Sequence, residues 1–173
     1  MEKIILLVGE SGVGKTTISE HLDSHGYGSV QSYTTRPKRF PGETGHIFVS
    51  DEEMDILEKD ACAYTVFDKH RYCATNSLVD GDGICVYIID PAGVEYFRKA
   101  YKGKKIPVVV KLEASNKVRY KRMRRRGDSP EAARQRIVHD VKAFKDLSCV
   151  DYRINAAGNI NNIVAEIEHI IES

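Results

Sequence analysis

A glycine-rich octapeptide close to the amino terminus constrains this chain more than any other feature. Its residues are Gly9-Glu10-Ser11-Gly12-Val13-Gly14-Lys15-Thr16, which fit the pattern G-x-x-x-x-G-K-[ST]. The apolar run 3–8 before it suits a buried strand, and residues 17–25 after it can form a helix. A turn that binds nothing would not need this strand, this spacing and the Lys-Thr pair together. The octapeptide is therefore predicted to be a phosphate-cradling loop between a strand and a helix.

The chemistry of such a loop depends on its backbone. Glycines let the chain curl so that N–H groups point inward at phosphate oxygens, and the following helix aims its positive dipole end at the same anion. Lys15 is expected to reach the β- and γ-phosphates of ATP, and the Thr16 hydroxyl to bind Mg²⁺. We therefore predict that residues 9–16, together with Thr17, bind ATP as in P-loop NTPases.

Length and charge exclude some classes of function. The chain has 173 residues, enough for one domain, and its net charge is only +1. That balance argues against a protein whose main task is to coat nucleic acid or an anionic membrane. We expect partners that are small-molecule nucleotides, with no nucleic acid and no membrane, and a chain that is a monomer or a homodimer.

The cysteines and the amino terminus bear on where the protein works. Cys62, Cys73, Cys85 and Cys149 are scattered without a CxxC pair, which favours reduced thiols over disulfides or a zinc site. The apolar run 4–8 is too short for a signal peptide or a membrane span. These features predict a cytoplasmic protein.

Strands and helices are expected to alternate along the rest of the chain. Strands are expected at residues 29–33, 84–89, 106–112 and 152–154, of which 84–89 and 106–112 are apolar runs, and helices from residue 91 and at 115–126, 131–147 and 160–171. Strands that alternate with helices imply a parallel sheet with helices on both faces, the α/β fold of P-loop NTPases. In the last helix, apolar residues recur at helical spacing and are expected in the core: Ile160, Ile163, Val164, Ile167, Ile170 and Ile171.

A segment with shorter elements interrupts this pattern. It combines short β-like pieces at 46–50 and 63–67 with a helix expected over 51–59. Ser50 and Glu53 have the spacing of a capping box at the start of that helix. We predict a single domain whose core is residues 1–33 and 83–173, with residues 34–82 inserted as a small subdomain.

Asp90 ends the apolar run 84–89 at the sheet edge where the glycine loop also lies. A carboxylate there can hold Mg²⁺, directly or through water, and it can also simply cap the helix that begins at Pro91. Both interpretations stay open at this stage.

Four arginines are candidates for handling phosphate. Arg36 and Arg39 lie three residues apart in a loop with Pro and Gly, where they can fork around a second phosphate or serve as surface charges. Arg126 and Arg136 bracket a Gly-Asp-Ser-Pro break, and a mobile loop there can close over a triphosphate. Most other cations of the basic stretch 117–127 are expected to form a solvated helix face.

Several further motifs follow the octapeptide in a fixed order. They are Ser32-Tyr33-Thr34-Thr35-Arg36, Arg39, Pro41-Gly42-Glu43, Phe48-Val49-Ser50, Tyr72, Asp90 with Gly93, Arg126-Gly127, Arg136-Ile137 and Asp151-Tyr152. In this order and spacing the chain resembles the guanylate kinase family over nearly its whole length, with small deletions. The Ser-x-Thr-Thr-Arg segment with its Pro-Gly-Glu tail is specific to that family, whereas the octapeptide alone is not.

The resemblance implies an enzyme that uses ATP and Mg²⁺ to phosphorylate a nucleoside monophosphate, with GMP or dGMP as the default acceptor. By position, Arg36, Arg39 and Tyr72 would grip the acceptor phosphate from the inserted segment. Ser32 and Asp90 would lie near the base or its bound network.

The same resemblance implies how the group is transferred. Residues 126–136 would form a lid, from which Arg126 and Arg136 contact the phosphoryl group in transit. The expected catalytic residues are Lys15, Arg36, Arg126 and Arg136, and the expected metal ligands are Thr16 and Asp90. Such chemistry needs no covalent nucleophile, because it depends on positioning and charge stabilisation.

Departures from the family pattern concern the base. His46 stands where the family has a tyrosine, and Ala63 where it has the glutamate that reads guanine. Arg71-Tyr72-Cys73-Ala74 replaces Tyr-Tyr-Gly-Ser/Thr, and Ile88-Ile89-Asp90 replaces Asp-x-Asp. Because a base is discriminated strongly only with its polar partners in place, guanine selection is expected to be weaker, unless Asp68 or Thr75 substitutes.

Three other hypotheses stay open. The first is a P-loop kinase for another phosphorylated acceptor, such as a different nucleotide or a sugar phosphate. The second is a non-catalytic guanylate-kinase-like binding module, which the retained Lys15 and Thr16 disfavour. The third is a nucleic-acid-dependent ATPase, which the near-neutral charge and short length disfavour.

Overall fold

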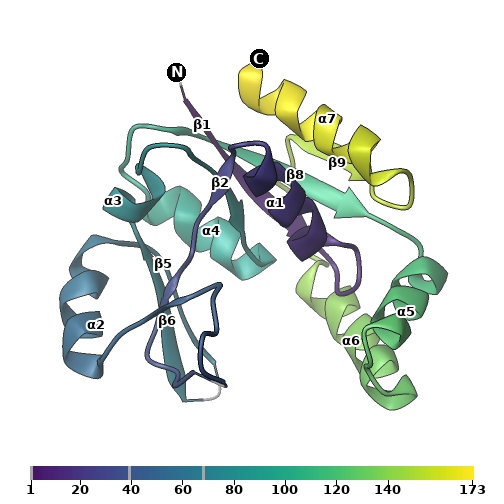
Figure 1. Cartoon of the computed structure of the whole chain (residues 1–173), viewed down its shortest axis with the longest axis horizontal. Helices are drawn as coiled ribbons and strands as arrows, with labels where there is room; N and C mark the ends of the chain where they lie inside the picture. The colour runs from purple at the N-terminus through teal and green to yellow at the C-terminus, as the bar shows by residue number, and fades with distance from the viewer. Residues whose placement is uncertain (1, 39, 68) are drawn as a thin grey trace.

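The main sheet of the protein consists of five strands, all paired in parallel, in the order β2-β7-β1-β8-β9 (Figure 1). This is a computed structural model, and it describes residues 2–38, 40–67 and 69–173. The strands of this sheet are β1 Lys3–Gly9, β2 Gly28–Ser29, β7 Ile84–Ile88, β8 Ile106–Glu113 and β9 Tyr152–Asn155. The α/β fold that the sequence predicts is therefore confirmed.

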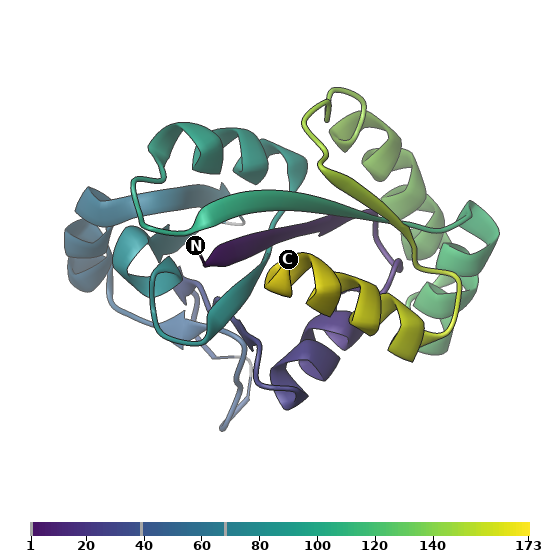
Figure 2. The ribbon, with the colours of Figure 1, turned by 90° about the horizontal axis from the view of Figure 1, so that it is seen from above.

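Helices cover both faces of the main sheet. Figure 2 shows α1 (Lys15–Ser24) and α7 (Ile160–Glu172) on one side of the sheet, and α4 (Pro91–Ala100) and α6 (Pro130–Ala143) on the other. Alternation along β1 explains the two layers, because Ile5 and Leu7 pack toward α1 and α7 whereas Ile4, Leu6 and Val8 pack toward α4. Each face therefore has its own apolar core.

The last helix behaves as its spacing predicts. Ile163, Val164, Ile167 and Ile170 are buried in the first of these cores, and Ile160 and Ile171 pack against it half-buried. The preceding helix, α6, is shorter than predicted and ends at Ala143. Beyond it the chain turns more tightly, with the Leu147 N–H donating to the Phe144 carbonyl at 3.3 Å.

The predicted strand 29–33 is wrong as a single element. Its first part belongs to β2, and the Val30 N–H still donates to the Val86 carbonyl at 2.8 Å. The chain then leaves the main sheet, and the Ser32 carbonyl accepts from the Ile47 N–H at 3.0 Å in a second sheet. One predicted strand thus supplies residues to two sheets, and the crossing between them includes Ser32.

The second sheet has the order β4-β3-β6-β5 and is built from residues 33–75. Its strands are β3 Tyr33–Thr34, β4 Ile47–Phe48, β5 Ala61–Phe67 and β6 His70–Thr75, of which β6 was not predicted. The helix α2 (Asp51–Leu57) lies beside this sheet and continues into a 3₁₀ turn, Glu58–Asp60. After β6, the short helix α3 (Asn76–Val79) leads back to the main sheet.

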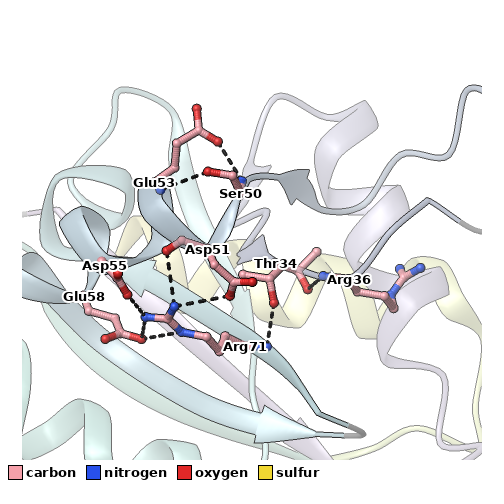
Figure 3. Close-up of polar contacts among 9 residues, drawn as sticks. Thr34, Arg36, Ser50, Asp51, Glu53, Asp55, Glu58 and Arg71 are labelled. Carbon is pink, nitrogen blue, oxygen red and sulfur yellow. Dashed lines mark hydrogen bonds and ion pairs between the residues drawn. The ribbon is translucent and has the colours of Figure 1, made fainter.

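The start of α2 carries the predicted capping box. The Glu53 N–H donates to Ser50 Oγ at 3.1 Å, and the Ser50 N–H donates to Glu53 Oε2 at 2.7 Å (Figure 3). Arg71 of β6 then binds the helix to the sheet, because its guanidinium donates to Asp55 at 2.7 Å and through Nε to Glu58 at 2.9 Å. Carboxylates of α2 and of the 3₁₀ turn after it therefore engage Arg71 of the second sheet.

The four cysteines form no disulfide, as the sequence predicts. Cys62 and Cys73 are buried, and burial raises the pKa of the Cys62 thiol to about 12 and that of Cys73 to about 11. Both therefore stay protonated at neutral pH. Among the helices in the described residues, none has both the length and the apolar character needed to cross a membrane.

The packing of α7 predicts a measurable difference between two isoleucines. Ile167→Ala removes a side chain that is 0% exposed, and should lower the free energy of unfolding by about 2–5 kcal/mol in urea titrations. Ile56→Ala on α2 is the matched control, since that side chain is 67% exposed, and should change the value by less than about 1 kcal/mol. Equal losses in the two variants would contradict this assignment of the core.

Candidate phosphate-binding loop and adjoining cleft

The glycine loop connects β1 to α1 and requires glycine at two positions. Gly12 and Gly14 have φ angles of +76° and +110°, in the left-handed region that side chains disfavour. A Cβ on Gly12 would also lie 2.7 Å from the Arg119 carbonyl of α5 (Asn116–Arg125). The loop is therefore shaped both by its own torsions and by the helix packed against it.

The amino end of α1 is open to an anion. Its cap, Gly14, offers no side chain to the first-turn N–H groups, and that turn contains no acidic residue. Unpaired N–H groups and the helix dipole together favour a negative ligand at this position. The strand–loop–helix context predicted for residues 9–16 is thus present.

Lys15 is folded onto the loop. Its ammonium donates to the Gly9 carbonyl and lies 3.5 Å from the Glu10 carbonyl oxygen. Burial lowers the pKa of Lys15, and the nearby carboxylates of Asp140 and Glu10 oppose that shift. A phosphate group would give this partly desolvated cation a stronger partner than the two carbonyls.

Two cavities adjoin the loop and meet at Lys15. The smaller, of about 640 Å³, lies over residues 11–18 and is also lined by Arg122, Arg126 and Arg136. The larger, of about 1100 Å³, extends from Gly9 and Lys15 toward the second sheet. Residues Ser11, Lys15 and Arg136 line both cavities. In Figures 1 and 2 the second sheet lies toward one end of the molecule and α5 and α6 toward the other, with the loop between them.

Three of the predicted acceptor residues line the larger cavity together. Ser32 comes from the crossing between the sheets, Tyr72 from β6, and Asp90 from the end of β7. The fold therefore brings these side chains, which are far apart in the sequence, to one cleft with Lys15.

Arg36 lies in the connection between β3 and β4 and is already paired. Its Nη2 donates to Glu43 Oε1 at 2.9 Å and its Nη1 to Glu43 Oε2 at 3.2 Å, and its guanidinium lies 5.4 Å from the Phe48 ring centroid. The hydrogen bond with Glu43 raises the pKa of Arg36 further. Figure 3 shows it directed away from the carboxylates around Arg71. The other predicted arginine of this loop, Arg39, falls outside the described residues.

Asp90 caps the helix that follows it. Its Oδ1 accepts from the Gly93 N–H at 2.6 Å, and Pro91 occupies the first turn of α4. The cap interpretation is thus confirmed, while the exposed carboxylate still faces the larger cavity. Thr16, the other predicted metal ligand, lines the smaller cavity. Within the described ranges, no group of three or more His, Cys, Asp or Glu side chains is placed to hold a metal ion.

Arg126 and Arg136 converge on one carboxylate at the tip of α5 and α6. Arg126 donates to Asp128 through Nε at 2.9 Å and Nη2 at 2.8 Å, and Arg136 Nε lies 3.5 Å from Asp128 Oδ2. The hydrogen bonds from Arg126 lower the pKa of Asp128. Both arginines are about half exposed, with side-chain exposures of 50% and 55%.

Two other arginines of α5 contact the loop, so they are exceptions to the solvated face predicted for most cations of this helix. Arg122 donates to the Val13 carbonyl at 2.7 Å and to the Ala156 carbonyl at 2.8 Å. Arg119 is 4% exposed and donates to the Ser11 carbonyl at 2.9 Å. Their three-residue spacing, continued by the buried Met123, was the available signal that one face of this basic helix is buried.

Strands β5 and β6 line the part of the larger cavity that reaches the second sheet. Ala63 of β5 lies there, whereas its partner on β6, Ala74, is fully buried and does not line the cavity. Thr75 does not substitute there, because its hydroxyl accepts from the Leu78 N–H at 3.2 Å and caps α3. Asp68, the other suggested substitute, lies outside the described residues. The His46 ring packs edge-on against Tyr72, with centroids 5.6 Å apart.

Comparison with known proteins places this fold in a family. A family model described as an AAA domain matches residues 5–142, which include the glycine loop, the second sheet and most of α6. The chain belongs to this AAA domain family. A search of the curated proteins finds no match to this chain.

Solved structures of other proteins have a fold similar to that of this chain. Guanylate kinase from Anaplasma phagocytophilum aligns with a TM-score of 0.58 over 99% of this chain and 85% of that one, at 16% sequence identity. Identity this low shows a shared fold and nothing about the substrate. The P-loop NTPase-like fold of this chain is therefore shown, and the role of each cleft residue is a separate question.

Capping by Asp90 can be tested separately from its charge. Asp90→Asn retains a capping oxygen and should leave the free energy of unfolding within about 0.5 kcal/mol of wild type. Asp90→Ala removes the bond to the Gly93 N–H and should cost about 1 kcal/mol in urea titrations. If both variants lost the same stability, the carboxylate charge and not the cap would be the stabilising feature.

Proposed function

We propose that this protein transfers the γ-phosphoryl group of ATP to the phosphate of a nucleoside monophosphate, with GMP or dGMP as the default acceptor. The observation that carries this proposal is the meeting of two cavities at Lys15 and Arg136. One cavity lies over the glycine loop and suits a triphosphate. The other opens toward Ser32, Tyr72 and Asp90 and suits an acceptor.

The donor side of the proposal rests on charge and backbone geometry. The left-handed Gly12 and Gly14 and the uncapped start of α1 favour phosphate oxygens in the smaller cavity. Lys15 and Arg136 stand where both cavities can reach them, so they would neutralise charge on the group in transit. Arg126 would join them if its pair with Asp128 opened.

Mg²⁺ fits this arrangement although the protein supplies few ligands. The ion prefers hard oxygen ligands and usually combines one or two protein groups with phosphate oxygens and waters. Thr16 would supply a hydroxyl beside the triphosphate, and Asp90 would hold a bound water from the larger cavity. When bound, the ion would screen the charges of the phosphates that must approach each other.

The acceptor side rests on the second sheet. Arg36 and Tyr72 lie on neighbouring strands or their connection, and Arg39 belongs to the same loop in the sequence. An acceptor phosphate carries up to two negative charges, so it would compete with the single carboxylate of Glu43 for Arg36. Water would be excluded as the second sheet and the α5–α6 tip approach each other.

A second acceptor class is favoured by Ala63, which lines the larger cavity. Guanine presents adjacent N–H donors that a carboxylate would match, whereas Ala63 presents only a methyl group. Of the carboxylates that line this cavity, Asp90 caps α4 and Asp140 is held by the loop. A different nucleoside monophosphate or a sugar phosphate is therefore the alternative acceptor.

The proposal is tested by release of ADP from ATP and Mg²⁺ over a panel of nucleoside monophosphates and sugar phosphates. GMP-dependent release supports the default acceptor, and release with another member alone supports the alternative.

Lys15→Ala should reduce turnover on the order of 10²- to 10³-fold with an unchanged melting temperature, because it removes a cation from the transfer site. Lys99→Ala, an exposed lysine on α4, is the matched control and should retain turnover. Wild-type turnover in Lys15→Ala would remove the kinase proposal.

Arg36→Ala should weaken acceptor binding about tenfold or more and change ADP binding by less than about twofold, since Arg36 belongs to the second sheet. Calorimetric titration with the active acceptor and with ADP separates the two. Glu43→Gln is the partner control: it frees Arg36 from its carboxylate, so acceptor affinity should be retained or increase. Equal losses for both ligands in Arg36→Ala would contradict this division between the cavities.

A further inference from the structure

A buried ion pair joins the two helices beside the loop. Arg119 of α5 and Asp140 of α6 are only 5% and 8% exposed in their side chains, and Arg119 Nη2 donates to Asp140 Oδ2. Arg119 Nη1 also donates to Asn116 Oδ1 at 3.0 Å. Neither residue was singled out as a site residue by the motifs of the sequence.

Both members of the pair also hold Ser11 of the glycine loop. The Ser11 N–H donates to Asp140 Oδ2 at 2.9 Å, and its hydroxyl donates to Asp140 Oδ1 at 3.3 Å. The Ser11 carbonyl accepts from Arg119 Nε at 2.9 Å. All three polar groups of Ser11 are therefore bound by the ion pair, and the loop is fixed to α5 and α6 at this residue.

The position of Asp140 on its helix links it to Arg136. Residues four apart lie about one turn from each other on the same face of a helix. Both side chains line the larger cavity with Lys15, and Ser11 lines it too. The bonds of Asp140 to Ser11 thus set how far Arg136 stands from the loop.

The charge of Asp140 needs its partner. A carboxylate beside the phosphate-binding loop repels a triphosphate and attracts Lys15, and Arg119 offsets the first effect. Buried ion pairs contribute little net stability because both charges lose water, whereas removal of one partner leaves a costly unpaired charge. The pair is thus better explained by geometry at the loop than by stability.

We propose that Arg119 and Asp140 are positioning residues for phosphoryl transfer. Asp140 fixes Ser11 and, through α6, the place of Arg136, and Arg119 shields bound nucleotide from the Asp140 charge. This inference rests on the proposed function for its turnover prediction, but its nucleotide-binding prediction requires only that the loop binds ADP.

The test compares Arg119→Met, Asp140→Asn and the double variant by calorimetric titration with ADP and by turnover with the active acceptor. Arg119→Met should weaken ADP binding about tenfold or more, because the carboxylate is left unpaired near the phosphates. Asp140→Asn should bind ADP at least as tightly as wild type, yet lose about tenfold in turnover, because α6 is no longer held by a charged bond.

The double variant separates positioning from folding. It has no unpaired charge, so it should fold and bind ADP within about threefold of wild type, while its turnover stays about tenfold low. Recovery of turnover together with affinity would overturn the positioning role, as would ADP binding by Arg119→Met equal to wild type. If Arg119→Met does not fold, the double variant still decides the question.

Controls distinguish this inference from the proposed function. Arg153→Met breaks an exposed ion pair with Glu113, whose side chains are 54% and 44% exposed, and should change neither ADP affinity nor turnover. A wild-type protein that binds ADP but phosphorylates no acceptor would refute the proposed function. In that case the ADP affinities of the single and double variants still uphold or overturn the shielding of bound nucleotide by Arg119, which requires only that the loop binds ADP.

Discussion

The parallel pairing of β1 with β7 on one side and β8 on the other determines where ligands can bind in this protein. Parallel strands end at the same edge of the sheet, so the glycine loop after β1 and Asp90 after β7 come together although they are far apart in the sequence. The chain that leaves β2 adds Ser32 to the same edge as it crosses to the second sheet. The residues after β1, β2 and β7 that line the cavities therefore lie at one edge of the main sheet.

Charge compensation is the second organising feature. Three arginines, one from the second sheet and two from α5 and its end, have carboxylate partners within the protein: Arg36 with Glu43, Arg119 with Asp140 and Arg126 with Asp128. Without ligand, these partners offset the repulsion that clustered arginines would otherwise suffer. The exposed pair at the α5–α6 tip is the easiest for a phosphate to displace, whereas the buried pair of Arg119 is the hardest.

The sequence predicts the loop well, because its torsions and spacing are local properties. The octapeptide, the capping box at Ser50 and the apolar run 84–89 all depend on residues within one element and its immediate neighbours. The strand β6 was missed because His70-Arg71-Tyr72 is polar and its apolar residues are consecutive, so no period of two appears. Its strand character comes from pairing with β3 and β5 on either side.

Buried charge was missed for a different reason. Arginine and aspartate are usually exposed, so a basic helix predicts a solvated face unless its partner is known. Arg119 is buried only because α6 brings Asp140 to it from 21 residues further along the chain. Likewise, the split of residues 29–33 between two sheets follows from the partners available to each half, which no local pattern records.

The second apolar core has a consequence for how this molecule unfolds. It combines Ile4 and Leu6 of β1 with Cys62 and Ala74 of the second sheet and Phe97 of α4. Loss of the second sheet would expose part of one face of the main sheet, so the segment that carries Arg36 and Tyr72 depends on the same apolar cluster as the strand that carries the glycine loop. Heat or denaturant should therefore melt both sheets in one cooperative transition, even though the chain crosses between them through short connections.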